Sequence, residues 1–153
     1  MSQPSLFGPG GGGSATANID GGSRGNPGPA SYGVRIELDD GAVVELKQSV
    51  GVATNNVAEY HGLLAALRWA CEHQIATLHL RSDSLLLVQQ MKGVYRVKHP
   101  GLQPLYEEAR GLVRGIGRVT FEHVRRELNK DADRLANEAM DEASGIADWN
   151  LPR

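Results

Sequence analysis

The sequence contains a single cysteine, Cys71, so one chain cannot form an internal disulfide. A lone cysteine fits the reducing cytosol. No apolar run approaches the length of a membrane span, and the first residues lack the basic and apolar regions of a secretory signal. We therefore expect a soluble, cytoplasmic protein that is monomeric and has no membrane partner.

An excess of basic residues is also missing, because 16 Lys and Arg stand against 18 Asp and Glu, for a formal net charge of −2. Proteins that bind nucleic acids are usually basic, so the balance argues mildly against such a partner. The argument is weak, because carboxylates that hold divalent cations would reverse the local field.

At 153 residues the chain is long enough for one domain with a hydrophobic core. Residues 1–14 are rich in Gly, Pro and Ser, which predicts a flexible N-terminal tail. The expected folded domain spans residues 15–143, and residues 144–153 are interpreted as a C-terminal tail.

Alternating apolar residues predict strands over 15–20, 32–38 and 42–50, with a hairpin signal at Asp39-Asp40-Gly41 between the last two. The remaining chain predicts helices over 57–73, 84–92, 102–114 and 130–143, with strands over 77–82 and 119–124. This order indicates an α/β fold with a five-stranded mixed sheet, whose first three strands are antiparallel, flanked by helices. Ligands of such sheets tend to bind where strands end.

Four acidic residues stand at the expected ends of these elements. Asp20 and Asp83 end the first and fourth strands, and Glu59 and Asp133 lie in the first turns of the first and last helices. If these two strands are neighbours and both helices begin at the same edge, the four carboxylates converge. They would then raise one another's pKa values, and a divalent metal is the obvious relief. Mg²⁺ or Mn²⁺ prefers such oxygen ligands.

Each acid also has an interpretation that needs no chemistry. Asp20 could cap a glycine-rich turn, and Glu59 has the spacing of a capping box from an asparagine three residues earlier. Asp83 with Ser84 could cap the short helix, and Asp133 could favour its helix dipole. Taken singly, the acids leave both interpretations open.

Four segments together resemble ribonuclease H of type 1. They are Asp20-Gly-Gly-Ser-Arg-Gly-Asn-Pro-Gly-Pro29, Thr54-Asn-Asn-Val-Ala-Glu-Tyr60, Ser82-Asp-Ser84 and Asn129-Lys-Asp-Ala-Asp-Arg-Leu-Ala-Asn137. The segments follow the family's order and approximate spacing from about residue 15 to residue 143. The resemblance implies a ribonuclease H-like fold and endonucleolytic hydrolysis of the RNA strand of RNA–DNA hybrids, leaving 5′-phosphate and 3′-hydroxyl ends.

The resemblance also assigns the four acids to catalysis and metal binding. It implies that two Mg²⁺ or Mn²⁺ ions activate a water and stabilise the leaving oxygen. Asp20 and Asp83 would contact both ions, and Glu59 and Asp133 one ion each.

Substrate contacts follow from the same resemblance. Positions that touch the minor groove of the hybrid, where 2′-hydroxyls distinguish RNA from DNA, correspond to Gly21, Gly22, Asn26, Asn55 and Asn56. Thr54, together with Asn26, matches a pocket for a phosphate of the DNA strand. The same residues could at the same time form hydrogen bonds that stabilise the turn and cap the helix.

This chain departs from the family pattern in two places. Many members carry a basic helix and loop after the fourth strand, whereas here residues 91–100 run directly into the next helix. Arg96 and Lys98 are candidates for part of that grip, with a solvated linker as the alternative. The loop before the last acid is too short for the family's mobile histidine, so Arg126 or Glu127 is a candidate to act near the scissile phosphate.

The short form resembles the archaeal-like branch, some members of which also cut double-stranded RNA. Two alternatives to a hybrid-specific nuclease therefore stay open. One is the same fold with broader activity on double-stranded RNA. The other is a non-catalytic hybrid-binding module, which would be expected to have lost a metal ligand, whereas all four acids are present.

Overall fold

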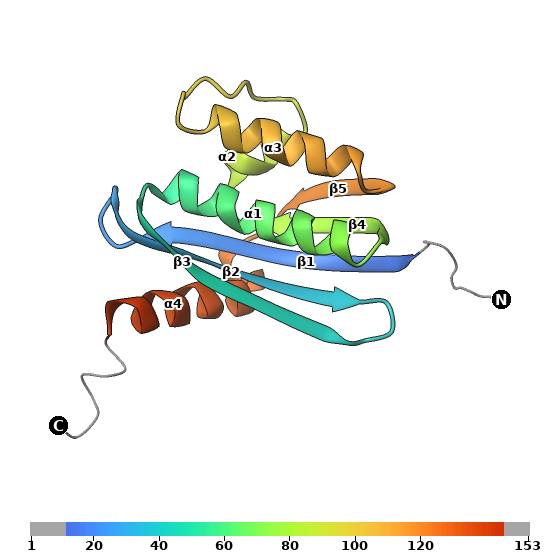
Figure 1. Cartoon of the computed structure of the whole chain (residues 1–153), viewed down its shortest axis with the longest axis horizontal. Coiled ribbons are helices and arrows are strands. Elements are labelled where there is room, and N and C mark those ends of the chain that lie inside the picture. The colour runs from blue at the N-terminus through green and yellow to red at the C-terminus, as the bar shows by residue number, and fades with distance from the viewer. Residues whose placement is uncertain (1–11, 146–153) are drawn as a thin grey trace.

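The computed structural model describes residues 12–145, which form an α/β fold (Figure 1). The elements in chain order are β1 (Gly12–Ser23), β2 (Gly28–Leu38), β3 (Val43–Ala53), α1 (Asn55–Glu72), β4 (Ile75–Ser82), α2 (Leu85–Met91), α3 (Gln103–Arg114), β5 (Arg118–His123), a 3-10 turn (Arg126–Leu128) and α4 (Lys130–Ser144). Within this part of the chain, no helix has the length and apolar character needed to cross a bilayer.

The five strands form one sheet in the order β3-β2-β1-β4-β5. β1, β2 and β3 pair antiparallel, whereas β4 lies parallel to both β1 and β5. The predicted mixed sheet is therefore confirmed. Ile19 of β1 stands opposite Ser82 of β4, so Asp20 and Asp83 follow at neighbouring positions of two adjacent strands.

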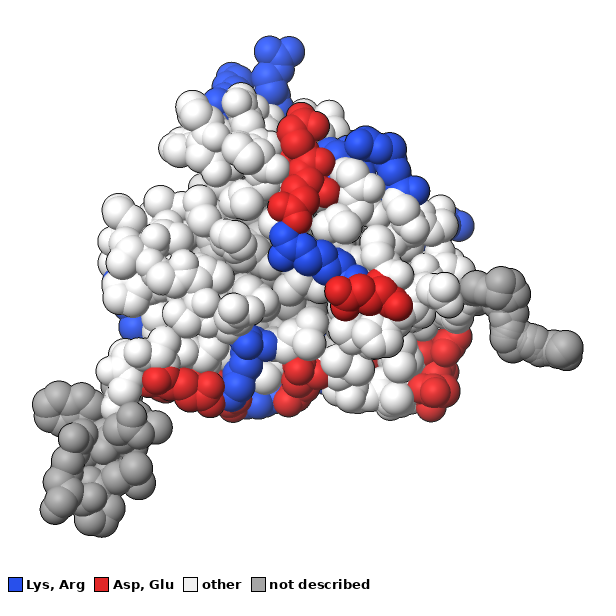
Figure 2. All heavy atoms as spheres, in the orientation of Figure 1, with Lys and Arg blue, Asp and Glu red and all other residues white. Residues whose placement is uncertain are grey.

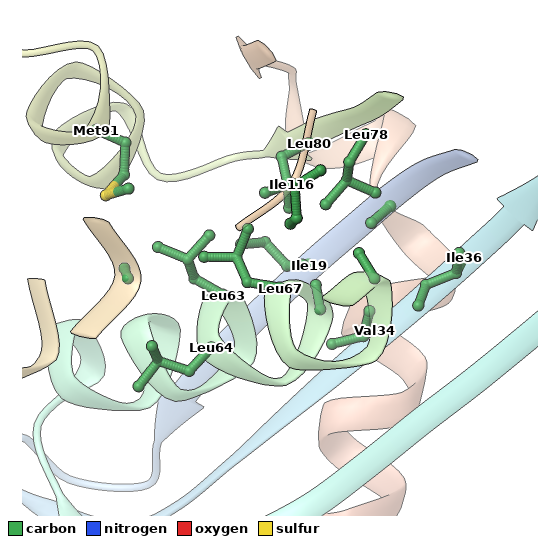
Figure 3. Packing of buried hydrophobic residues seen from close by; sticks show 14 of the residues in the cluster. Ile19, Val34, Ile36, Leu63, Leu64, Leu67, Leu78, Leu80, Met91 and Ile116 are labelled. Atoms are coloured by element: carbon green, nitrogen blue, oxygen red, sulfur yellow. The ribbon is translucent and has the colours of Figure 1, made fainter. Parts of the chain in front are cut away.

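α1 lies on one face of the sheet and α4 on the other, and α3 packs on α1 (Figure 1). Alternate strand residues point at α1, so that Ile19 and Leu80 meet Leu63 and Leu67 in the core (Figure 3). All four side chains are at most 2% exposed. Apolar residues repeat every two positions in the strands and about every 3.6 positions in α1, so each element has one apolar face. Burial of these two faces against each other holds α1 on β1.

Charged side chains join α4 to the outer strand β3. Lys47 Nζ lies 3.1 Å from a carboxylate oxygen of Glu138 and 2.7 Å from one of Glu142, and Arg134 lies 2.6 Å from Glu45. Acidic and basic side chains accordingly alternate along the lower edge of the molecule in Figure 2. Each exposed pair of this kind contributes little to the stability of the fold. Together they help to orient α4 along the sheet.

Several element boundaries differ from the sequence prediction. β1 extends to Ser23, so Asp20 lies within this strand rather than at its end, although the pairing of β1 with β4 stops at Ile19. β1 begins at Gly12, because Gly12 pairs with Ile75 and Ser14 with Thr77, so the last three residues assigned to the N-terminal tail are strand. α4 includes Ser144 and ends at Gly145, whose φ of +76° gives a left-handed cap. The remaining tail predictions concern residues 1–11 and 146–153, which lie outside the described residues.

The start of α1 is also earlier than predicted. Thr54 is the N-cap, and its Oγ1 accepts a hydrogen bond from the Val57 amide at 3.2 Å. Glu59 is therefore the fifth helical residue rather than a member of the first turn, and the capping-box interpretation of this acid is wrong. Capping by Ser84 is confirmed, because its Oγ accepts from the amide of Leu87 at 3.2 Å.

Candidate active site and metal centre

A glycine lets α1 rest directly on the strand that carries Asp20. A Cβ atom on Gly21 would lie 2.5 Å from the backbone carbonyl of Ala58, which is closer than any side chain permits. Because Gly21 offers no side chain, the backbone of α1 can approach β1 at this point. Glu59 follows Ala58 in the chain and is thereby brought to Asp20.

A second glycine does the same for α4 on the opposite face. Gly33 is the β2 residue paired with Asp20, and a Cβ there would lie 2.3 Å from the carbonyl oxygen of Ala132 and 2.6 Å from the Ala136 amide nitrogen. The close approach places the first turn of α4 over β2, so Asp133 comes near Asp20 of β1. Gly21 and Gly33 thus allow two helices on opposite faces of the sheet to approach the same carboxylate, Asp20.

The four predicted acids come together at this edge of the sheet. Asp20, Glu59 and Asp83 each present one carboxylate oxygen to a group whose members all lie within 4.8 Å of one another. Asp133 lies outside that group but is near enough to the Asp20 carboxylate to contribute to the raised pKa of Asp20. All four line one cleft of about 570 Å³. Clustered carboxylate oxygens are the ligands that Mg²⁺ and Mn²⁺ prefer, so the residues fit a hard divalent cation.

Burial and nearby carboxylates raise the pKa values of Asp20, Glu59 and Asp83. Burial, with smaller contributions from Asp83, Asp133 and Glu59, raises the pKa of Asp20 to about 8. Burial also raises the pKa of Glu59 to about 7, against a hydrogen bond from Ser84 that lowers it. The pKa of Asp83 is raised by burial too, although the guanidinium of Arg126 opposes the shift. The cluster therefore cannot be fully ionised near neutral pH without a compensating cation.

The metal-free protein should lose stability as pH rises. The pKa of Asp20 is about 8 when folded and near its ordinary 3.8 when unfolded, so the folded state binds the extra proton throughout that interval. The free energy of unfolding consequently decreases from pH 5 to pH 8, and we expect the thermal midpoint in EDTA to fall by several degrees. Mg²⁺ added at pH 8 should restore it. Circular dichroism melts would check this, and an identical pH slope in Asp20→Asn would contradict it.

A buried asparagine, Asn129, connects the start of α4 to β1. Asn129 is only 1% exposed to solvent. Nδ2 donates to the carbonyl oxygen of Ile19 at 2.8 Å, and Oδ1 accepts from Nδ2 of Asn18 at 3.0 Å. This side chain therefore holds the start of α4, and with it Asp133, against β1 beside Asp20. Sequence reasoning assigned Asn129 no role, although it begins the segment containing Asp133.

Asn129→Ala should destabilise the fold by about 1–3 kcal/mol, because the Ile19 carbonyl and the Asn18 amide would lose their buried partner. Urea unfolding would measure the change. Asn137→Ala is the matched control, since that side chain is exposed and donates only to the carbonyl of Asp133 one turn earlier. Its effect should stay within about 0.5 kcal/mol, and equal losses in both variants would contradict a special role for Asn129.

The glycine-rich loop is tied to the start of α1 by two asparagines. Asn55 Oδ1 accepts from the amide of Ser23 at 2.8 Å and from its hydroxyl at 3.1 Å, while Asn26 Oδ1 accepts from the Asn55 amide at 3.0 Å. The turn and cap chemistry expected of these residues is therefore present. Among the predicted substrate contacts, the residues that line the cleft are Gly21, Gly22, Asn55, Asn56 and Arg126, whereas Asn26 and Thr54 are outside its lining.

The predicted basic residues divide between two places. Arg126 lines the cleft, with Nε 4.0 Å from a carboxylate oxygen of Asp83, whereas Glu127 is outside the lining. Arg96 and Lys98 are exposed in the connection between α2 and α3, where basic side chains stand at the top of Figure 2. They line a neighbouring hollow that shares Leu86 with the cleft. The structure thus places them beside the cleft rather than in it.

A family model and two relatives of known sequence match most of this chain. A family model described as "Reverse transcriptase-like" matches residues 18–139. A bifunctional protein of Mycobacterium tuberculosis is 50% identical over 130 residues, which cover 84% of this chain but only 36% of that protein. Ribonuclease HI of Halobacterium salinarum is 44% identical over 133 residues, covering 86% of this chain and 67% of the relative. The chain therefore spans little more than a third of the mycobacterial relative.

Solved structures show the same similarity in three dimensions. The N-terminal RNase H domain of the mycobacterial protein superposes with a TM-score of 0.82 and 47% identity, covering 88% of this chain and 98% of that one. LC11-RNase H1, solved in complex with an RNA/DNA hybrid, gives a TM-score of 0.80 and 38% identity, with 84% and 98% coverage. Both similarities extend over more than four fifths of this chain.

Proposed function

The chain belongs to the ribonuclease H family, and on that premise we propose that it is an endoribonuclease hydrolysing the RNA strand of RNA–DNA hybrids. The products would carry 5′-phosphate and 3′-hydroxyl ends. The observation that carries the proposal is the group of Asp20, Glu59 and Asp83 oxygens within 4.8 Å of one another, with Asp133 alongside. Similarity to a ribonuclease HI and to a structure holding a hybrid supports the choice of substrate.

We assign the metal to the four acids, as two Mg²⁺ or Mn²⁺ ions in the substrate complex. When bound, these ions would supply an activated water and neutralise charge at the scissile phosphate. Asp20 and Asp83, which follow the last paired residues of β1 and β4, would be the ligands common to both ions, with Glu59 and Asp133 serving one each. Arg126 stands beside Asp83 and is exposed, so its guanidinium is available to a phosphate oxygen.

Selection of the RNA strand would come from the cleft wall next to Asp20. A Cβ on Gly22 would have no neighbour closer than 3.6 Å, so a sugar can approach the backbone there. Asn55 uses its amide oxygen for Ser23, which directs the Nδ2 donors elsewhere. With Asn56, these groups could bind a 2′-hydroxyl, which a DNA strand lacks.

The proposal includes a cytoplasmic, monomeric protein. The single cysteine supports a reducing compartment. In the segment between α2 and α3, Arg96 and Lys98 would add phosphate contacts for a hybrid that extends beyond the cleft.

A substrate panel tests the proposal. Hybrid, double-stranded RNA and double-stranded DNA of one sequence are incubated with Mg²⁺, with Mn²⁺ or with EDTA, and each strand is labelled separately. We expect cleavage of the hybrid's RNA strand only, and only with metal. Cleavage of double-stranded RNA would extend the activity, whereas hybrid binding without cleavage of any substrate would show a binding module. Asp83→Asn is the control against a contaminating nuclease.

A further inference from the structure

One arginine of the cleft wall has no role in the site described above. Arg24 lies in the glycine-rich loop and lines the cleft, and its Nη2 is 2.7 Å from Oδ1 of Asp141 in α4. Both side chains remain more than 40% exposed. The loop itself is held in place, because the Arg24 amide donates to the Pro29 carbonyl at 2.8 Å and Ser23 is fixed by Asn55. The backbone that carries the Arg24 guanidinium is therefore fixed at the cleft.

The charges of the cleft put this arginine in a distinctive place. Its charged lining residues are the four acids together with Arg24 and Arg126. Arg126 precedes the N-terminal end of α4, and Arg24 pairs with a residue of its last turn, so the two cations stand at opposite ends of that helix. A polyanion laid along α4 across the metal centre would meet a cation on each side.

The distance along α4 suits a nucleic-acid backbone. Asp133 and Asp141 are eight residues apart on one helix, or about 12 Å at 1.5 Å per residue. A nucleic-acid strand carries one phosphate per roughly 3.4 Å of duplex axis. With the cleaved bond at the four acids, a phosphate near Arg24 would belong to a nucleotide a few steps away.

Asp141 lies at a helix position that is unfavourable for a carboxylate. It occupies the last turn of α4, where the negative end of the helix dipole repels a carboxylate, and this turn contains no basic residue. Its contact with Arg24 compensates for that position. The pair uses one of the five guanidinium N–H donors, and exposed pairs of this kind are weak, so a phosphate can compete for Arg24.

We propose that Arg24 binds a backbone phosphate of the hybrid outside the metal centre, and that Asp141 is a competing internal partner that weakens this contact. The inference rests on the proposed function, because it takes the hybrid as the ligand of the cleft. Arg24 is then a positioning residue for the substrate, and the Arg24–Asp141 pair limits how tightly substrate and product are held.

Opposite effects of the two substitutions test the proposal. Binding of a fluorescent hybrid is measured in a common Asp83→Asn background, which prevents cleavage, over a range of KCl concentrations. Arg24→Ala should raise Kd about 5–10-fold at low salt and reduce the salt slope by about one phosphate contact. Asp141→Asn should lower Kd about 2–3-fold, and this gain should vanish when Arg24 is also replaced. Arg24→Lys should retain most of the affinity, since it keeps the charge.

Glu142→Gln is the matched control. It also removes one negative charge, at the residue next to Asp141, but Glu142 pairs with Lys47. It should change Kd less than Asp141→Asn does. Weaker binding in both Arg24→Ala and Asp141→Asn would show a merely structural pair and overturn the proposal, as would unchanged binding in Arg24→Ala. If the parent protein fails to bind the hybrid at all, the proposed function itself fails, and the inference fails with it.

Discussion

Asp20→Asn should reduce cleavage of the hybrid by at least about 10³-fold while raising the stability of the metal-free protein. Asp20 lies in the group of three acids and is influenced by Asp133 as well, so its loss would remove the centre of the proposed metal site. Losing several kcal/mol of transition-state stabilisation corresponds to this factor. The neutral amide would, however, relieve the buried carboxylate whose pKa is about 8, and the thermal midpoint in EDTA at pH 8 should rise by several degrees.

Single-turnover cleavage, hybrid binding and thermal melts of the same variant check this prediction together. Binding should persist, because the substitution removes a negative charge from a cleft that receives a polyanion. Asp131→Asn provides the control, since that carboxylate lies on α4 but pairs with Arg35 and Arg134 instead of lining the cleft. Near-normal cleavage by Asp20→Asn would refute the metal assignment.

Gly33→Ala should destabilise the protein by about 2–4 kcal/mol and lower its activity at the same time. The new methyl group would lie 2.3 Å from the Ala132 carbonyl oxygen and 2.6 Å from the Ala136 amide nitrogen, both of which are backbone atoms of α4. A flexible side chain could move aside, whereas here the whole helix must shift. Because Asp133 follows Ala132, the shift would separate this acid from Asp20.

Gly111→Ala is the opposing control. This glycine is exposed within α3, and a Cβ there would find its nearest neighbour at 3.9 Å, on the flexible side chain of Arg114. Alanine favours a helix over glycine, so the variant should gain about 0.5–1 kcal/mol. Urea unfolding of both variants measures the difference, and a Gly33→Ala protein as stable as the wild type would mean that α4 is free to move away from β2.

Much of this architecture could be predicted from the sequence because the local signals agree with one another. Alternation in residues 32–38 and 42–50, with Gly41 between them, predicted a hairpin whose turn does adopt a φ of +91°. Asp20 and Asp83 were expected side by side at the ends of two strands, and the β1–β4 register places them side by side, although β1 extends beyond Asp20. Residue-type periodicity suffices for such features, since it reflects which face of an element is buried.

Other features depended on contacts between distant segments. Gly12 to Ser14 look like a flexible tail when read alone, and only the neighbouring β4 turns them into strand. Gly21 was expected to contact substrate, but its packing against the backbone of α1 depends on a helix more than thirty residues later. The pairing of Arg24 with Asp141 likewise joins the first loop to the last helix. No local pattern reports a partner of this kind.

The parallel pairing of β1 with β4 also bears on how long the folded protein lasts. It joins residue 12 to residue 75 and residue 19 to residue 82, and the acids at 20, 59, 83 and 133 come from β1, α1, the β4–α2 connection and α4. Closing such long loops is entropically costly, which makes these contacts late events in folding. A cation held only by the completed site would slow unfolding far more than it speeds folding. The metal centre would then set the lifetime of the native state as well as its chemistry.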